Sequence, residues 1–229
     1  VGFTLQYELS YTNILNMMRL AGIPMLAAKR DENYRLLLAG GPCAYNPEPL
    51  APFMDFFVIG DGEEVVLDIV EAIRRVKADK SRTRNDKLVA LSDIDGVYVP
   101  ELTNAKVHGR FVADLDKAQF PDSLVVPFTE AVHDRVALEI MRGCARGCRF
   151  CQAGMITRPV RERSLSVLCA QAATLLNKTG YEEVALTSLS SADHSCIGDL
   201  VSTLIDCHES NGVGISLPSL RADAQCVAL

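Results

Sequence analysis

Three cysteines lie within eight residues of one another in this 229-residue chain, and they form the group of side chains best suited to chemistry. Cys144, Cys148 and Cys151 are separated by three and by two residues. Structural zinc usually takes four ligands, and ferredoxin-type clusters also take four cysteines. Three thiolates on one loop can instead hold three corners of an iron–sulfur cube and leave one iron with the open position that catalytic metals keep.

The surroundings of these cysteines favour a catalytic metal site. They follow residues 135–140, whose apolar pattern predicts a strand, and α/β enzymes place their chemistry in loops at the carboxyl ends of parallel strands. The other five cysteines are scattered singly, as expected for small core residues in a cytoplasmic protein rather than for a disulfide scaffold. They are Cys43, Cys169, Cys196, Cys207 and Cys226. The alternatives are a zinc knuckle or ferredoxin-like site that borrows Cys169 or Cys196, and a purely structural turn.

The cysteine run resembles the signature of radical S-adenosylmethionine (SAM) enzymes, Cys-x3-Cys-x-aromatic-Cys, with Phe150 at the aromatic position. The longer run Arg-Gly-Cys-Ala-Arg-Gly-Cys-Arg-Phe-Cys-Gln-Ala-Gly is similar to an uncharacterised group of these proteins that carry an upstream B12-binding-type domain. The similarity extends from Gly40-Gly41 through residues 60–64 and 96–100 to residues 216–221.

This resemblance implies an enzyme with a [4Fe–4S] cluster held by the three cysteines. The fourth iron would be chelated by the amino and carboxylate groups of SAM, which is cleaved reductively to methionine and a 5′-deoxyadenosyl radical. A reductant such as flavodoxin or ferredoxin would supply the electron, and methyltransferase or methylthiotransferase-like activity on an unknown substrate is expected. The alternative function is a non-catalytic iron–sulfur or zinc module for electron transfer or scaffolding, which a fourth thiolate would favour.

The candidate SAM-binding residues follow the next two predicted strands. Ser188, Ser190, Ser191 and Asp193 stand where the family often has Gly-Gly-Glu, and they would meet the SAM ammonium with nearby carbonyls. An ordinary turn with a helix N-cap explains the same residues. Ser219 and Arg221 follow the strand after that and would contact SAM or substrate, although Arg221 fits a solvated surface cation equally well. Adenine is expected near Phe150.

Residues 142–163 contain six arginines and one acid, Glu162, and therefore carry a local charge of +5. The whole chain has a net charge of −6, so the remainder carries −11. Arginines beside an anionic cluster and the SAM carboxylate would neutralise them, which we favour because the charge is local. Binding of an anionic macromolecule such as RNA is the alternative. The arginines are Arg142, Arg146, Arg149, Arg158, Arg161 and Arg163.

Two stretches of alternating strands and helices position these residues. Apolar runs that end in glycine predict buried parallel strands. Residues 1–80 are expected to form part of a doubly wound, B12-binding-like α/β domain, and 134–229 the first half of a radical SAM partial (β/α) barrel. Residues 81–133 read as a polar connector with one hairpin. Because only three βα units follow residue 134, we expect a truncated barrel and an internal fragment.

Cobalamin is a further cofactor that the resemblance implies. The Asp-x-His-x-x-Gly loop that would ligate cobalt is absent from this chain, and it would normally lie upstream of Val1. Gly40-Gly41 and Gly60-Asp61-Gly62 would let a corrin or nucleotide tail approach the backbone, or they are simple strand-end turns. The chain contains no run of about 18 apolar residues, so no membrane span is predicted.

Overall fold

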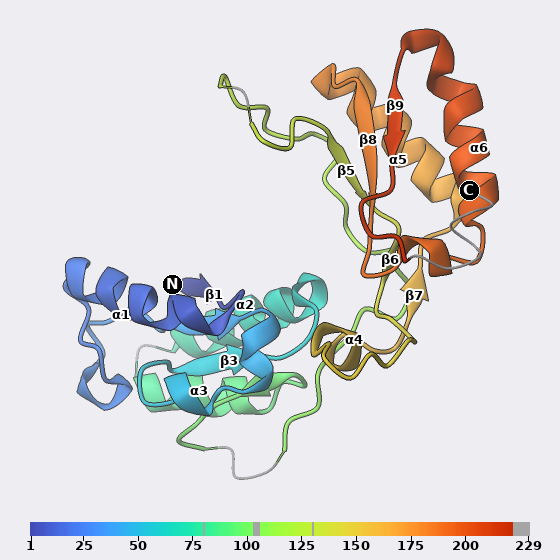
Figure 1. The fold of residues 1–229 in the computed structure, drawn as a ribbon. Helices are drawn as coiled ribbons and strands as arrows, with labels where there is room; N and C mark the ends of the chain where they lie inside the picture. The colour runs from blue at the N-terminus through green and yellow to red at the C-terminus, as the bar shows by residue number, and fades with distance from the viewer. Residues whose placement is uncertain (80, 103–105, 130, 222–229) are drawn as a thin grey trace. The chain divides into compact units, whose positions relative to one another are not determined.

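The computed structural model describes residues 1–79, 81–102, 106–129 and 131–221 (Figure 1). They fall into two compact units, Val1–Val112 and Ala113–Leu229. The division lies well beyond residue 80, where the sequence predicted the first domain to end. Much of the expected connector therefore belongs to the first unit.

The first unit contains one four-stranded sheet and three α-helices. Strands β1, β2 and β3 run parallel in that order, and β4 is antiparallel to β3, with Val97 opposite Val58. The strands are β1 (Gly2–Thr4), β2 (Leu38–Gly40), β3 (Phe56–Val58) and β4 (Val97–Tyr98). The helices are α1 (Tyr11–Leu20), α2 (Gly62–Ala78) and α3 (Arg84–Ser92).

Successive residues of β3 bury into opposite faces of this sheet, as the two-residue period of a strand requires. Phe57 packs with Ile14 and Met18 of α1. Phe56 packs in a second cluster that contains Ile69 of α2 and other side chains of α2 and α3. Helices therefore cover both faces, which confirms the predicted doubly wound α/β layer.

Helix α3 lies in the segment that the sequence analysis assigned to a solvated connector. Thr83 and Asp86 form a capping box: the Asp86 amide donates to Thr83 Oγ1 at 3.3 Å, and the Thr83 amide donates to Asp86 Oδ2 at 2.7 Å. Leu88 and Leu91 then bury against the sheet. The helix has only two buried positions among nine residues, so its apolar pattern is too short to stand out from the polar run before it.

Residues 96–100 lie within the expected connector, and Val97–Tyr98 among them form β4. Their partner is β3 of the first sheet, so this strand is not half of the hairpin expected within 81–133. In the described part of that stretch, no two segments pair with each other as strands.

The described part of the second unit contains two complete βα repeats, β5 with α5 and β8 with α6, and the strand of the third, β9. Strands β5, β8 and β9 are parallel in that order, with Val136 opposite Val184 and Val184 opposite Ile215. Their apolar side chains pack with Leu168 of α5 and Leu200 of α6 in one core. The strands are β5 (Val136–Glu139), β6 (Met141–Arg142), β7 (Arg161–Glu162), β8 (Glu183–Thr187) and β9 (Gly214–Ser216), and the helices are α4 (Ala153–Ile156), α5 (Leu165–Thr179) and α6 (Ile197–His208). This confirms the predicted parallel (β/α) arrangement.

Within the described residues, no helix is both long and apolar enough to span a bilayer.

Candidate cofactor site

The three cysteines stand on the loop between β6 and β7, two strands that, within the described residues, pair only with each other. We call residues 143–160 the cysteine loop. Its base is closed by an antiparallel ladder in which Met141 faces Glu162. Gly143 has φ +85°, and a Cβ there would lie 2.7 Å from the Pro159 carbonyl oxygen. Only glycine allows the two ends of the loop to approach this closely. The chain therefore presents the cysteines on a closed hairpin-like excursion rather than on an open strand connection.

All three cysteine side chains are free thiols. Cys144 and Cys151 are half-buried and Cys148 is exposed. The Cys151 amide donates to the Cys148 carbonyl at 3.0 Å, and the Gly154 amide donates to Cys151 Sγ at 3.4 Å. A Cβ on Gly154 would lie 3.7 Å from Cys151 Sγ and 3.8 Å from Cys144 Cβ, so these two cysteines flank the same glycine.

This donor set fits an iron–sulfur cluster better than a closed metal site. Within the described residues, no three His, Cys, Asp or Glu side chains converge tightly enough to hold a single metal ion. A cluster spreads its ligands over separate irons, and amide hydrogen bonds to its sulfurs are one of the features that set its potential. Three thiols on a tight loop, one of them already accepting an amide, suit that attachment.

A fourth thiolate was the feature that would have favoured a non-catalytic module. Cys169 on α5 is half-buried, and burial first and the neighbouring Cys207 of α6 second raise the pKa of its thiol. Cys196 is exposed beside Ser195. In the described part of the second unit, neither of these forms a metal-binding group with the loop cysteines. Cys226 lies outside the described residues.

Residues 188–195, which we call the serine loop, follow β8 and meet the cysteine loop directly. Arg146 forms a two-point ion pair with Asp193: its Nε lies 2.7 Å from Oδ2, and its second nitrogen contacts Oδ1. The Ser191 amide donates to the Ser219 carbonyl at 3.0 Å. The segments that follow β5, β8 and β9 therefore come together at one edge of the sheet, as parallel strand order predicts.

Asp193 is the ionised centre of this edge. The Arg146 guanidinium is the main cause that lowers the pKa of the Asp193 carboxyl, and burial opposes it. Ser190 and the positive charge of Arg221 lower that pKa further. Arg221 is thus coupled electrostatically to the serine loop, although its side chain is exposed.

The serine hydroxyls differ in what they do. Ser191 is fully buried, and its hydroxyl donates to the Leu186 carbonyl at 3.0 Å and lies 3.0 Å from Ser188 Oγ. Ser188 Oγ also accepts the Ser190 amide at 3.2 Å. Ser190 is buried, and its hydroxyl makes no hydrogen bond of ordinary geometry within the described residues, although it is close enough to affect Asp193. The Ser191 hydroxyl therefore stabilises the turn, and the Ser190 hydroxyl is available to bond a ligand.

Two further contacts, which the sequence did not predict, join the serine loop to Glu162 and Arg163, just after the cysteine loop. Glu162 accepts the Ser195 amide at 3.0 Å and the Ser195 hydroxyl at 2.5 Å. His194 is buried; its Nδ1 accepts the Cys196 amide at 3.2 Å, so the tautomer assigned here carries its proton on Nε2, which donates to the Arg163 carbonyl at 3.1 Å. The one signal in the sequence was Glu162, the single acid among the arginines.

Several of the arginines bond within the second unit. Arg142 holds Glu139 through contacts of 2.8 and 3.0 Å, and Arg158 Nε donates to the Cys144 carbonyl at 3.1 Å. Arg161 and Arg163 are buried. Arg146, Arg149 and Arg158 are exposed, so part of the local charge of +5 lies on the surface, and binding of an anionic macromolecule such as RNA stays a prediction. Phe150 is 91% exposed, so its predicted contact with adenine stays a prediction.

The glycines of the first unit line a groove of about 470 Å³ beside α2. Gly41 and Gly60 have φ +101° and +109° and approach the backbones of Leu5 and Arg110, so turn geometry alone explains them. Turn geometry does not explain Gly40 and Gly62. A Cβ would meet only an ordinary contact at 3.6 Å at Gly40 and open space at Gly62. With Val65, Val66 and Ile69 in its wall, the groove fits an apolar, flat group.

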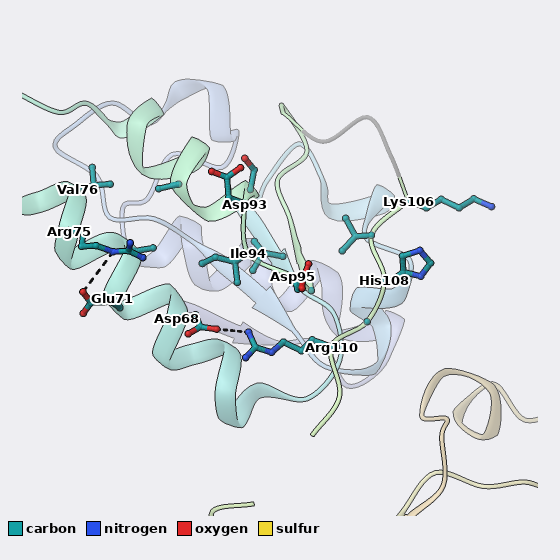
Figure 2. Close-up of a pocket in the computed structure, with 17 residues that line it drawn as sticks. Asp68, Glu71, Arg75, Val76, Asp93, Ile94, Asp95, Lys106, His108 and Arg110 are labelled. Atoms are coloured by element: carbon teal, nitrogen blue, oxygen red, sulfur yellow. Dashed lines mark hydrogen bonds and ion pairs between the residues drawn. The ribbon is translucent and has the colours of Figure 1, made fainter. Parts of the chain in front are cut away.

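A larger cavity of about 1130 Å³ lies on the other side of α2, beneath the turn between α3 and β4 (Figure 2). Its lining combines charges of both signs, and several already pair with each other, as Arg110 does with Asp68 and Arg75 with Glu71. None of the residues predicted to bind a cofactor lines this cavity. Its volume alone therefore does not make it the functional site.

Comparisons with known proteins agree with this arrangement. Residues 1–100 match the family described as radical SAM proteins, N-terminal. This match, the three-cysteine loop and the paired α/β units support the radical SAM superfamily, with a B12-binding-type α/β fold in the first unit.

The relatives are longer proteins. The chain is 32% identical over 225 residues to the uncharacterized protein MJ0966 of Methanocaldococcus jannaschii, covering 96% of this chain and 44% of that one. It is 27% identical over 135 residues to the anaerobic magnesium-protoporphyrin IX monomethyl ester cyclase of Cereibacter sphaeroides, covering 57% of this chain and 21% of the cyclase. The chain thus spans less than half the length of the relatives it matches.

Solved structures show the same fold. The radical SAM methyltransferase TsrM from Kitasatospora setae, with cobalamin and a [4Fe-4S] cluster bound, superposes with a TM-score of 0.56 at 15% identity, over 94% of this chain and 43% of TsrM. A second TsrM structure, with tryptophan substrate and a SAM analog, gives a TM-score of 0.56 at 14% identity, over 94% of this chain and 42% of that one.

Proposed function

We propose that this chain forms the cofactor-binding part of a radical SAM enzyme, with a [4Fe–4S] cluster on Cys144, Cys148 and Cys151 and SAM beside the serine loop. The observation that supports it best is the junction of the three segments after β5, β8 and β9 through Arg146, Asp193 and Ser219. When bound, the reduced cluster supplies the electron for reductive cleavage of SAM. The protein supplies binding, orientation and exclusion of water.

The Arg146–Asp193 pair gives this site charges of both signs. The amino-acid end of SAM carries an amino group and a carboxylate. While these groups chelate the open iron, the N–H groups of the amino nitrogen can donate to Asp193, and the second carboxylate oxygen can accept from Arg146. Asp193 is held ionised by its lowered pKa, and the Ser190 hydroxyl adds an acceptor. A buried ammonium without acceptors costs several kcal/mol, so the missing Gly-Gly-Glu must be replaced by such groups. Ser188 and Ser191 shape the loop, Phe150 takes adenine, and Ser219 and Arg221 face SAM or substrate.

Cobalamin is the second cofactor that we assign to the protein, in the glycine-lined groove of the first unit. Gly40 and Gly62 leave the groove open where a side chain could stand, and its walls are apolar. The TsrM fold, solved with cobalamin and named as a methyltransferase, supports a methylation or methylthiolation reaction here. A flavodoxin- or ferredoxin-like reductant completes the system. The cytoplasmic location stays a prediction.

Anaerobic reconstitution of the protein with iron and sulfide tests this function. We expect about four irons and four sulfides per chain, as a [4Fe–4S] cluster requires. Incubation with dithionite and SAM should then give 5′-deoxyadenosine or S-adenosylhomocysteine. Cys144→Ala, Cys148→Ala and Cys151→Ala should each abolish loading, whereas the matched control Cys43→Ala, a buried cysteine of the first unit, should not. Stoichiometric zinc without sulfide would refute the proposal.

A further inference from the structure

Arg163 is the residue through which three separate segments of the second unit meet. Its amide donates to the Ile140 carbonyl at 2.9 Å, at the end of β5. Its carbonyl accepts the His194 ring of the serine loop at 3.1 Å. Its guanidinium donates to the Leu115 carbonyl and lies 5.5 Å from the centre of the Phe120 ring. Leu115 and Phe120 belong to residues 113–120, which we call the entry segment.

The guanidinium of Arg163 is also bonded to the strand that carries the cysteine loop. One of its nitrogens lies 3.5 Å from Glu139 Oε2, and the same carboxylate is held by Arg142 at the base of that loop. Next to Arg163, the Ser164 amide donates to Asp116 of the entry segment at 2.8 Å. Arg163 therefore contacts the entry segment, the base of the cysteine loop and the serine loop at once.

The burial of this arginine is unusual for a charged side chain. Arg163 is 1% exposed, and its Nε has no hydrogen-bond partner among the described residues. Charged side chains are rarely buried to this extent, and an apolar side chain of similar volume often stabilises such a position. A role in fixing geometry explains why a forked cation stands here, because a guanidinium bonds two partners in fixed directions and an ammonium acts as a point charge.

We propose that Arg163 is a positioning residue that sets the cysteine loop and the serine loop relative to each other and to the entry segment. The inference rests on the proposed function only in that these two loops hold the cluster and SAM. It adds that the chain entering the second unit and the cofactor site are linked through one buried residue, whose side chain bonds the entry segment and Glu139 and whose main-chain carbonyl bonds His194 of the serine loop.

Hydrogen exchange of the protein without cofactors tests this link. Arg163→Lys keeps the positive charge and loses the fork, so it can bond either Leu115 or Glu139 and not both in the present directions. We expect peptides of the entry segment to exchange roughly tenfold faster, because the Leu115 carbonyl loses its donor. Peptides of residues 191–197 should exchange faster by a smaller factor, because the main-chain carbonyl that accepts His194 is no longer held in place by the side chain of residue 163. Glu139→Gln, a milder change at a partly exposed position, should give the same pattern with a smaller amplitude.

Arg161→Lys is the matched control, because Arg161 is a buried arginine of β7, two residues before Arg163, and its Nε bonds the Pro159 carbonyl. It should leave the exchange of the entry segment unchanged. Reconstituted Arg163→Lys should keep the iron content of the unsubstituted protein and bind SAM several-fold more weakly. Exchange that rises in one segment alone, or in neither, would overturn the link. Failure of the unsubstituted protein to load iron would refute the proposed function and leave the exchange result to decide on Arg163.

Discussion

Two groups of ion pairs with the same chemistry lie at opposite ends of their sheets. In the first unit Asp55 stands just before β3, with Arg30 3.2 Å and Arg84 2.7 Å from its two oxygens. In the second unit the Arg146–Asp193 pair lies beyond the carboxyl ends of β5 and β8. In α/β folds, ligands bind beyond the carboxyl ends of the strands, so position predicts a structural role for the first group and a ligand-binding role for the second.

Burial separates the two groups in the same way. The side chains of Arg30 and Asp55 are 0% and 2% exposed, whereas those of Arg146 and Asp193 are 39% and 16% exposed. Asp55 also accepts the Leu37 amide at 2.6 Å, and Arg30 donates to the carbonyls of Pro24 and Phe53. Asp55 is thus surrounded by protein donors, and Asp193 is open to a ligand.

The largest expected effect is on the stability of the first unit. Asp55→Ala leaves two buried guanidinium groups without their carboxylate, and we expect a loss of about 3–5 kcal/mol in the free energy of unfolding. Urea denaturation followed by circular dichroism measures it. Glu71→Ala removes a carboxylate from exposed pairs with Arg74 and Arg75 and should cost at most about 1 kcal/mol. Equal losses would contradict the distinction that burial makes.

The exposed pair should behave in the opposite way. Asp193→Asn removes a charge-assisted contact, so we expect SAM to bind the reconstituted protein about 10- to 100-fold more weakly while stability changes by at most about 1 kcal/mol. Equilibrium dialysis with SAM and urea denaturation measure the two quantities. A large loss of stability with unchanged SAM affinity would place Asp193 in the same structural class as Asp55.

The serine hydroxyls should give a smaller effect. Replacing Ser188 and Ser190 together by Ala removes one hydroxyl that shapes the turn and one that faces Asp193, and we expect several-fold weaker SAM binding with unchanged iron content. Ser202→Ala, at an exposed position of α6, is the control. Equal SAM affinity in the double variant would move the site away from this loop, and a loss of iron would mean that the loop shapes the cluster pocket.

The sequence predicted the parts of this molecule that repeat a pattern. Apolar runs bounded by glycine gave the parallel strands, and strand order brought the serine loop to the cysteine loop. Helix α3 was missed because only Leu88 and Leu91 mark its buried side. The contacts of His194 and Arg163 could not be predicted, because each depends on a main-chain carbonyl more than 30 residues away. Every residue has such a carbonyl, so the residue type at that position gives no signal.

The smallest predicted effect is the pH dependence of the Arg146–Asp193 pair. Arg146 lowers the pKa of the Asp193 carboxyl below its ordinary value of 3.8, so the folded state binds this proton less readily than the unfolded state. The pair therefore stabilises the protein fully above that ordinary value, and its contribution disappears as the pH falls through the lowered pKa. Since Arg146 is more than one-third exposed, solvent screening limits the contribution to at most about 1 kcal/mol. Urea denaturation from about pH 6 to about pH 2 should show the unsubstituted protein losing its advantage over Asp193→Asn. If the two proteins lose stability in parallel, the pair does not stabilise the fold, and Asp193 is kept for its ligand alone.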